Sequence, residues 1–443
     1  MIAKIINNKK VTVNSNRVDG KFFLNQDSLD SAVLEDNKDK CVPLLKIASV
    51  FNPPVFKRQF CKKTNRSVMY FQSSDVPALS EYSSVFINKK QAESLNTLVH
   101  ENQILVTGFG TVGNVRLVSK LQENVCYANN VCRIVAKDNN LYGYVYAFMA
   151  SKYARAQLNK NASGSVVRYI EAPGIKTTLI PIFSESKQQE IHNLVIESAN
   201  LRVKANRLLE EATNIFDKLL DNEDKDRCKT ISISNIKNRF DAFSNLENYK
   251  IDAVIMEHAI GWISIKSISD KIFIGPRSKR NYVSKGTPFL SGSELQKANP
   301  IKVEKFLNHK DAIPFVINKD WILITRSGTI GSVSYVLPVL DGYAATDDAI
   351  RIITKLGSKV TAKYLYAFLS SEFGKRCVQK DIFGSVIQHI NEEQIGNVLI
   401  PIIETKSIEE KIDKYCTLLN ESIIKENQAI QLVEKEIESW QQS

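Results

Sequence analysis

The stretch Ile322-Leu-Ile-Thr-Arg-Ser-Gly-Thr-Ile-Gly331 has a counterpart earlier in the chain, Ile104-Leu-Val-Thr-Gly-Phe-Gly-Thr-Val-Gly113. The two stretches begin 218 residues apart, and each places a β-type apolar run before a glycine turn. A second β-type run follows each turn, at Val115–Val118 and at Val333–Val336. We therefore expect each stretch to form a strand, a tight turn and a second strand.

Other short matches keep nearly the same spacing, so the similarity extends along most of the chain. The matched segments are Asn16–Asp19 with Asn238–Asp241, Phe71–Asp75 with Leu290–Glu294, Asn129–Arg133 with Asp347–Arg351, Tyr144–Phe148 with Tyr364–Phe368, Gly164–Val167 with Gly384–Ile387, and Leu179–Ile182 with Leu399–Ile402. The repeated unit of about 220 residues is far longer than a solenoid repeat. The pattern indicates a tandem duplication that puts two similar binding surfaces on one chain.

Each copy is expected to end in a short helix, a proline and a long amphipathic helix. The short helices are predicted at 144–157 and 362–378, and the long ones at about 186–220 and 407–440. Apolar residues recur along both long helices at heptad spacing. They are Ile191, Leu194, Leu201, Leu208 and Ile215 in the first helix, and Ile412, Leu419, Ile423, Ile430 and Ile437 in the second.

Two apolar seams of equal length on one chain can bury each other, although Ser198 and Glu426 interrupt the pattern. This favours a two-stranded coiled coil formed by the two helices over separate packing of each helix on its own domain. We predict an α+β fold with an internal pseudo-twofold repeat and four segments. These are a β-rich domain at 1–183, a long helix at 184–222, a second β-rich domain at 223–403 and a long helix at 404–443. Charged residues at Asp221–Thr230 predict a solvated linker.

Composition favours a polyanionic partner. The 443 residues contain 59 Lys and Arg against 48 Asp and Glu, a formal net charge of +11, and such a surplus most often serves nucleic-acid binding. Seven scattered cysteines without C-x-x-C and five scattered histidines favour neither a disulfide framework nor a zinc site. No signal-peptide core or membrane-length apolar run is present, so we expect a cytoplasmic protein without metal or cofactor.

Two motifs suggest enzyme chemistry only in part. Gly108–Gly113 matches the G-x-G-x-x-G dinucleotide fingerprint, but a strand rather than the required helix is expected after it. Asn52-Pro-Pro-Val55 is similar to the N-P-P-aromatic loop of adenine methyltransferases, with valine in place of the aromatic residue. An adenine-specific DNA methyltransferase remains one alternative. A coiled-coil scaffold that binds no DNA is a second.

Basic clusters occupy corresponding positions in the two copies, Phe56–Arg66 and Arg277–Lys285, with aromatic residues between the charges. Lysine and arginine can neutralise phosphates, and arginine can also reach base edges. Arg326 and Ser327, in the glycine turn of the second copy, are further candidates. The predicted DNA-binding residues are Lys57, Arg58, Lys62, Lys63, Arg66, Arg277, Lys279, Arg280, Lys285, Arg326 and Ser327. No catalytic residue is predicted.

The doubled arrangement resembles the specificity subunit of type I restriction-modification systems. The residues that carry the resemblance are Thr107–Gly113, Thr325–Gly331, Gly384–Ile390 and Leu399–Ile402 before the last helix, and the resemblance covers about residues 14–440. It implies two target recognition domains that each read one half of a bipartite double-stranded DNA site. The long helices would pair as an antiparallel coiled coil that separates the domains and docks partner subunits.

The resemblance also implies a non-catalytic phage-defence subunit. It would direct methyltransferase subunits, expected to number two, and restriction subunits bound through them, to the DNA target. A bipartite recognition subunit for another defence effector is a further alternative. The first copy departs from the second because Gly108 stands where the second copy has Arg326. A DNA contact made by that arginine should be absent or rebuilt in the first copy.

Overall fold

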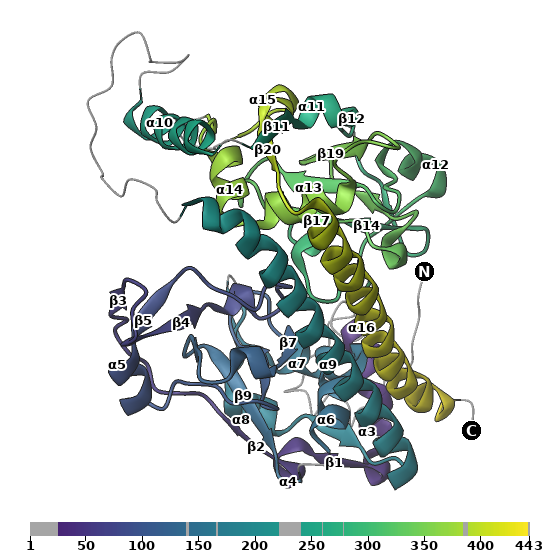
Figure 1. Ribbon diagram of the computed structural model, residues 1–443. Coiled ribbons are helices and arrows are strands. Elements are labelled where there is room, and N and C mark those ends of the chain that lie inside the picture. The colour runs from purple at the N-terminus through teal and green to yellow at the C-terminus, as the bar shows by residue number, and fades with distance from the viewer. Residues whose placement is uncertain are drawn as a thin grey trace. The chain divides into compact units, whose positions relative to one another are not determined.

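The structure is a computed structural model that describes residues 25–138, 141–164, 167–220, 241–258, 260–277, 279–383 and 389–441. The expected linker at Asp221–Thr230 and all or part of the matches at Asn16–Asp19, Asn238–Asp241, Gly164–Val167 and Gly384–Ile387 lie outside the described residues. The chain divides into two compact units (Figure 1). The first combines residues up to Val203 with those from Ser422 onward, and the second is Lys204–Glu421.

The first unit contains two four-stranded sheets and a short two-stranded one. The main sheet is antiparallel, in the order β2 (Ala48–Phe51), β9 (Val131–Ala136), β6 (Ile104–Thr107) and β7 (Val115–Leu117). The second sheet has the order β3 (Phe60–Cys61), β5 (Phe86–Asn88), β4 (Ser67–Phe71) and β8 (Cys126–Tyr127), and β1 (Cys41–Pro43) pairs with β10 (Leu179–Pro181). The helices outside the long ones are α3 (Gln26–Asp36), α4 (Leu44–Ile47), α5 (Lys89–Ser94), α6 (Tyr142–Met149), α7 (Lys152–Asn161) and α8 (Ala172–Lys176).

The second unit repeats this strand order. Its main sheet runs β12 (Ser269–Ile274), β19 (Ala349–Thr354), β16 (Ile322–Thr325) and β17 (Val333–Tyr335). Its second sheet runs β13 (Tyr282–Val283), β15 (Phe306–Leu307), β14 (Thr287–Leu290) and β18 (Ala344–Ala345), and β11 (Gly261–Ser264) pairs with β20 (Leu399–Ile402). The helices are α10 (Ala242–Glu257), α11 (Ile265–Ile268), α12 (His309–Ala312), α13 (Ala362–Ser370), α14 (Glu372–Gln379) and α15 (Glu392–Asn397).

The expected strand–turn–strand units are confirmed, because β6 pairs with β7 and β16 with β17 in antiparallel register. The prediction of one short helix in each copy is wrong. The helix expected at 144–157 is two helices, α6 and α7, and the one expected at 362–378 is α13 and α14. The break falls at Ser151 and Ser371, whose side chains cap the following helix by accepting a hydrogen bond from a backbone N–H. A serine at the N-cap starts a new helix because its hydroxyl satisfies a donor that the helix leaves unpaired.

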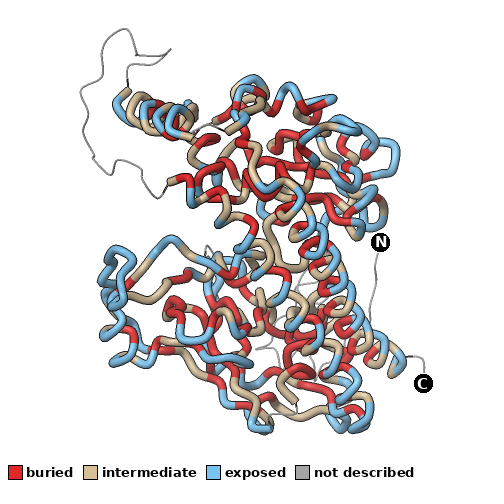
Figure 2. The backbone as a smooth tube through the Cα atoms, viewed as in Figure 1, coloured by how far each residue is buried: buried red, intermediate tan, exposed pale blue. Residues whose placement is uncertain are grey.

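The strand β6 is apolar along its whole length because both of its faces are covered. Ile104 and Val106 belong to one core cluster, together with residues of α6 and α7, whereas Leu105 belongs to a second cluster, with residues of β4 and β8. Alternating strand residues point to opposite faces of a sheet. Figure 2 shows buried backbone segments in the interior of each unit.

One arginine in each unit is buried and pairs with no carboxylate among the described residues. Arg133 on β9 and Arg351 on β19 are fully buried and occupy matched positions of the repeat. Arg133 donates hydrogen bonds to the carbonyl oxygens of Val131, Thr97 and Tyr127 at 2.7–3.1 Å. Burial lowers the pKa of each guanidinium to about 10. These arginines have a structural role, since their terminal guanidinium nitrogens donate to backbone carbonyls inside the fold.

The long helices are α9 (Glu185–Asp217) and α16 (Thr405–Ser439), close to the expected bounds. In the first unit the start of α9 and the end of α16 share one core, in which Ile191 and Val195 join Ala429, Val433 and Ile437. The last helix of the chain therefore completes the core of the first unit. Ion pairs and hydrogen bonds also connect these helical segments within the unit.

In the second unit, the end of α9 and the start of α16 pack in the corresponding way. Phe216 is fully buried and meets Tyr364 and Phe368 edge to face, with ring centroids 5.3 and 5.5 Å apart. The Glu211 carboxylate pairs with the Lys411 ammonium at 2.7 Å. Each unit thus contains a β-rich domain and one segment of each long helix.

The ten predicted seam residues differ in burial between the two helices. All five on α16 are buried, and they are Ile412, Leu419, Ile423, Ile430 and Ile437. On α9 only Ile191 is fully buried, whereas Leu194, Leu201, Leu208 and Ile215 are half-buried. The other fully buried positions of α9 include Val195, Ala205, Ala212 and Phe216. Heptad spacing located the buried side of each helix but not the depth of each residue. Among the described residues, no helix is long and apolar enough to cross a membrane.

Candidate nucleic-acid interface

The loops that carry the predicted DNA contacts leave one edge of the main sheet in each unit. In the first unit, strand register places the end of β2 (Phe51), the start of β9 (Val131), the end of β6 (Thr107) and the start of β7 (Val115) at that edge. The basic loop begins after Phe51, and the glycine turn begins after Thr107. Segments far apart in sequence are therefore neighbours at this edge.

The basic loop of the first unit is exposed and is anchored on an aromatic ring. Lys57, Arg58, Lys62, Lys63 and Arg66 are all exposed. The Arg58 guanidinium lies 5.6 Å from the centroid of the Tyr70 ring on β4 and donates a hydrogen bond to the Tyr70 hydroxyl. Phe60 meets the same ring edge to face at 5.7 Å and remains 60% exposed. The loop therefore presents an aromatic side chain among cationic ones.

The second unit builds the same arrangement from different residues. The Arg280 guanidinium lies 5.1 Å from the centroid of the Phe289 ring on β14, and Tyr282 meets that ring edge to face at 5.8 Å. Tyr282 remains 47% exposed. The structure thus brings both predicted basic clusters to equivalent places in the fold. The exposed cations of this second loop are Arg277, Lys279 and Lys285.

The two loops differ in charge balance. Arg280 forms an ion pair with Asp347, in the turn before β19. The first unit has Asn129 at the position of Asp347, so Arg58 has no equivalent carboxylate there. Ser327 donates a hydrogen bond to the neighbouring Asp348 carboxylate. In the second unit, Arg280 and Ser327 are therefore partly committed to partners within the domain.

The glycine turns have the same geometry in both units. Gly110 and Gly328 both have a φ of +74°, and Gly113 and Gly331 have φ values of +86° and +81°. A threonine before the turn, Thr107 or Thr325, donates a hydrogen bond across it at 2.5 Å. Because β7 follows in antiparallel register, Gly108–Gly113 lacks the helix that a dinucleotide site requires.

Arg326 is only half-buried, and its backbone fixes the start of the turn. Its N–H donates to the Asp348 carbonyl and its carbonyl accepts from Ile390, both at 3.2 Å. Its Nε is buried without a hydrogen-bond partner among the described residues. Gly108 makes the same two backbone hydrogen bonds in the first unit. A Cβ at Gly108 would lie 2.6 Å from the Ile170 carbonyl oxygen, so this copy has no room for a side chain.

Asn52 of the Asn-Pro-Pro-Val stretch has a structural role. Its amide nitrogen donates to the Asn129 carbonyl at 3.3 Å, and its amide oxygen accepts from the Ala172 N–H at 2.9 Å. Val55, in the position of the methyltransferase aromatic residue, is 85% exposed. Both ends of the Asn52 amide are thus occupied by backbone partners. This geometry gives no support to the methyltransferase alternative.

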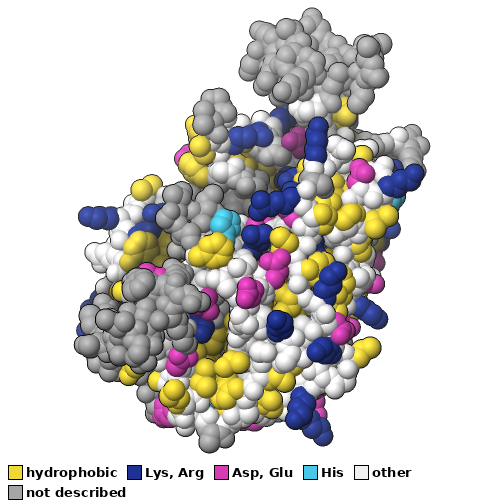
Figure 3. Space-filling view, turned by 90° about the horizontal axis from the view of Figure 1, so that it is seen from above, with side chains coloured by type: hydrophobic (Ala, Val, Ile, Leu, Met, Phe, Trp, Pro, Cys, Tyr) yellow, Lys and Arg dark blue, Asp and Glu magenta, His cyan; other side chains and the backbone are white. Residues whose placement is uncertain are grey.

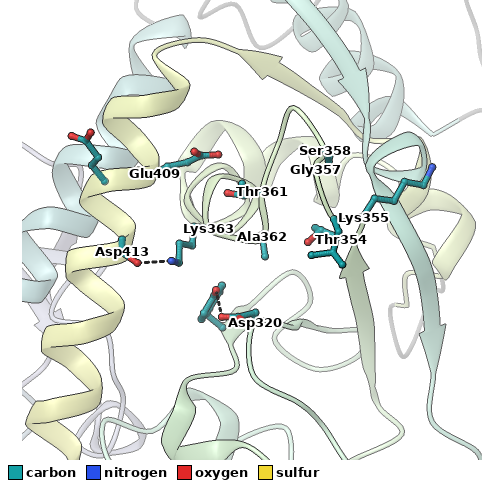
Figure 4. Close-up of a pocket in the computed structure, with 13 residues that line it drawn as sticks. Asp320, Thr354, Lys355, Gly357, Ser358, Thr361, Ala362, Lys363, Glu409 and Asp413 are labelled. Atoms are coloured by element: carbon teal, nitrogen blue, oxygen red, sulfur yellow. Dashed lines mark hydrogen bonds and ion pairs between the residues drawn. The ribbon is translucent and has the colours of Figure 1, made fainter.

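A pocket of about 520 Å³ lies elsewhere in the second unit (Figure 4). Its lining residues include the acidic Asp320, Glu409, Glu410 and Asp413 and the basic Lys355 and Lys363, and the Lys355 side chain extends away from the cavity to donate to the Ser267 carbonyl at 2.9 Å. Lys363 pairs with Asp413, and the Tyr335 hydroxyl donates to Asp320 at 2.8 Å. A wall with more carboxylates than amines repels phosphates, so this pocket does not extend the candidate DNA surface.

Figure 3 shows Lys and Arg side chains distributed among hydrophobic ones on the face that it draws. The five lysines at the two loops, Lys57, Lys62, Lys63, Lys279 and Lys285, are exposed and form no ion pair with any described residue. Exposed lysines on mobile stems suit phosphate contact, because they act as point charges and carry no base-specific geometry.

We predict that replacing one of these lysines, for example Lys62, with alanine weakens DNA binding similarly on all sequences. The slope of log affinity against log salt should fall by about one unit. Titrations of duplex DNA at several salt concentrations measure both effects. Lys414→Ala on the exposed side of α16 removes the same charge and should leave the slope unchanged. A lysine variant that prefers a different sequence would contradict the phosphate role.

Comparison with known proteins finds a family match in the second half of the chain. Residues 263–435 match the family model of the type I restriction modification DNA specificity domain. This part of the chain is similar to such a specificity domain. It begins in β11 and includes most of α16. The first unit has the same strand order in all three sheets, and the same glycine turn and arginine–aromatic contact. The architecture of the matched part of the chain is therefore present in both units.

Solved structures with similar folds include two specificity subunits. The S subunit of a type I restriction-modification system from M. genitalium is 15% identical, with 90% of this chain and 94% of that chain covered and a TM-score of 0.33. The HsdS subunit from Thermoanaerobacter tengcongensis is 14% identical, with 90% and 95% covered and a TM-score of 0.27. None of the curated proteins compared with the chain matches it. Because these TM-scores are low, the inferences below rest on the family match and the geometry.

Proposed function

We propose that this protein is the specificity subunit of a type I restriction-modification system. Each β-rich domain reads one half of a bipartite double-stranded DNA target. The observation that carries the proposal is the match to the specificity domain at 263–435 together with a first unit of the same strand order. Different loops on the same frame suit two unlike half-sites, because side chains on loops can change while the sheets stay the same.

The long helices act in this proposal as the spacer between the two half-sites. Their pairing is antiparallel, and it holds the recognition domains apart. Support comes from the contacts inside each unit, where an early segment of α9 meets a late segment of α16, and a late segment of α9 meets an early one of α16. Helix length then sets the length of the unread DNA between the half-sites.

The subunit is non-catalytic and directs other subunits to the DNA. Two methyltransferase subunits bind it, and restriction subunits join through them. The four segments at 1–183, 184–222, 223–403 and 404–443 are the recognition domains and spacer helices of this assembly. DNA chemistry resides in the partner subunits, and this chain supplies the choice of sequence.

The experiment is to coexpress the chain with its methyltransferase subunits and determine the methylated motif in the host DNA. A two-part motif with a fixed gap is expected. A hybrid chain in which residues 52–66 are exchanged for the equivalent loop of another specificity subunit should change only one half of the motif. If both halves change, or if the motif has no gap, the assignment of one half-site to each domain is wrong.

Three controls separate the alternatives. Methyl transfer from labelled S-adenosylmethionine by the purified chain alone would make it a methyltransferase. Absence of binding to any duplex DNA at low salt would make it a scaffold. A defence effector of another class, purified with the chain in place of methyltransferase subunits, would keep the recognition role and change the partner.

A further inference from the structure

Two aromatic rings stand exposed at the glycine turn of the first unit. Phe109 lies in the turn between β6 and β7, and Tyr169 lies just before α8. Their ring centroids are 5.6 Å apart and their planes differ by 20°, so the rings stack. Phe109 is 39% exposed and Tyr169 is 41% exposed. A stacked pair that remains this exposed is an apolar surface open to a partner.

The backbone holds the two rings in place. The carbonyl of Gly108 accepts a hydrogen bond from the Ile170 N–H at 2.8 Å, and the N–H of Gly110 donates to the Arg168 carbonyl at 3.1 Å. Tyr169 exchanges two hydrogen bonds of 2.9 Å with Ser163. The backbone on both sides of Phe109 is therefore held by hydrogen bonds to the segment before α8. Rings presented by a rigid backbone lose little conformational entropy when they bind.

The pair belongs to the same sheet edge as the basic loop. The Gly108 N–H donates to the Asn130 carbonyl at 3.1 Å, next to the residue whose carbonyl Asn52 binds. Asn52 in turn accepts from Ala172, which follows Tyr169 closely in the chain. The start of the basic loop, the glycine turn and the segment before α8 thus meet at one place. A duplex that contacts the basic loop lies beside this edge.

The equivalent position in the second unit is polar. Arg326 and Ser327 stand where the first unit has Gly108 and Phe109, and the chain pairs Ser327 with His389 as it pairs Phe109 with Tyr169. The two recognition domains therefore present different side chains from the same turn, although the second keeps an exposed ring beside it, because Phe383 is 39% exposed and lies 6.2 Å from the His389 ring. A cation and a hydroxyl suit hydrogen-bond acceptors, whereas stacked rings suit an apolar group.

We propose that Phe109 and Tyr169 form a base-reading contact of the first domain that recognises the 5-methyl group of a thymine in the major groove. This deepens the proposed function and rests on it. Thymine is the one base whose major-groove edge carries a methyl group, and phenylalanine is among the side chains that contact it. The pair takes the place of the Arg326 contact, which the first copy cannot make because Gly108 has no room for a side chain.

The test replaces thymines of the first half-site, one at a time, with deoxyuridine, which lacks the 5-methyl group. For the unaltered protein, one replacement should weaken binding about fourfold, the factor that corresponds to one buried methyl group. Phe109→Ala should weaken binding to the thymine-containing site roughly tenfold. The affinity of this variant should not change when any thymine is replaced with deoxyuridine. The salt slope should be the same in both proteins, because no charge is removed.

Phe243→Ala is the matched control, since this phenylalanine on α10 is 61% exposed and lies in the other unit. It should bind as the unaltered protein does, and thermal unfolding should show that both variants are folded. Equal deoxyuridine sensitivity of Phe109→Ala and the unaltered protein would overturn the proposal. So would loss of methyltransferase-subunit binding with DNA binding intact, which would make the pair a protein contact. Failure of the unaltered protein to bind duplex DNA would instead overturn the proposed function.

Discussion

Replacing Arg202 with leucine should lower the free energy of unfolding by about 3–5 kcal/mol, because the change leaves the Glu426 carboxylate buried without its partner. Arg202 and Glu426 form an ion pair at 2.5 Å inside the first unit, with side chains only 14% and 6% exposed. Glu426 also accepts a hydrogen bond from the Tyr146 hydroxyl at 2.6 Å. Burial and the Glu426 charge together raise the pKa of Tyr146 well above its usual value.

Urea unfolding followed by circular dichroism measures the loss. Lys425→Leu is the matched control, since Lys425 pairs at 3.0 Å with Glu197, whose side chain is 54% exposed. Loss of that surface pair should cost less than about 1 kcal/mol. Replacing Arg202 and Glu426 together with leucine should recover most of the stability, because no buried charge then remains. A single Arg202→Leu variant as stable as the unaltered protein would show that the pair does not hold the helices.

This ion pair is part of a polar layer between α9 and α16 in the first unit. Ser198 and Ser422 exchange hydrogen bonds, each hydroxyl donating to the other residue's carbonyl at 2.8–2.9 Å. Polar groups buried in a helix pair specify register, because any shift leaves them unsatisfied. The polar exceptions in the heptad pattern are thus a means of aligning the two helices. Register matters here because, in the proposed function, the helices measure the gap in the DNA.

Inserting four residues into α9 after Val203, together with four into α16 after Glu421, should lengthen the recognised gap by one or two base pairs and leave both half-sites unchanged, because both helices run through both units. Four residues add about 6 Å of helix, and B-DNA rises about 3.4 Å per base pair along each strand. The insertion in α9 also turns the following helix by only about 40° beyond a full turn, so the buried side around Ala205 keeps its direction. The measurement is the methylated motif of the variant coexpressed with methyltransferase subunits.

An insertion of two residues at the same two places is the control. It adds half the length but turns each helix by about 200°, so the buried sides face solvent and methylation should be lost. Ala205→Pro should have the same effect, because proline removes a helix hydrogen bond at a buried position. An unchanged gap in the four-residue variant would mean that helix length does not set the distance between the half-sites. A changed half-site would mean that they help to read bases.

Local sequence patterns were sufficient to predict the duplicated arrangement of strands and long helices. The hairpin at Ile104–Val118 follows from an apolar run, a glycine turn and a second run, and its two glycines at positive φ are where such a turn needs them. Heptad spacing located the long helices to within a few residues of α9 and α16. The basic loops could be matched between copies because they hold the same place in the repeat. Each of these signals depends on residues that are close in the chain.

The tertiary structure alone decided which distant residues meet. Glu426 looks like a defect in an apolar seam, and its partners Arg202 and Tyr146 lie more than 200 residues away. No spacing rule predicts that pair, because the cost of burying a charge is offset only once both helices are in place. In the same way, the stacking of Arg58 on Tyr70 and of Phe109 on Tyr169 depends on strand pairing. Periodicity records which side of an element is buried, whereas the identity of each contact depends on how separate elements pack.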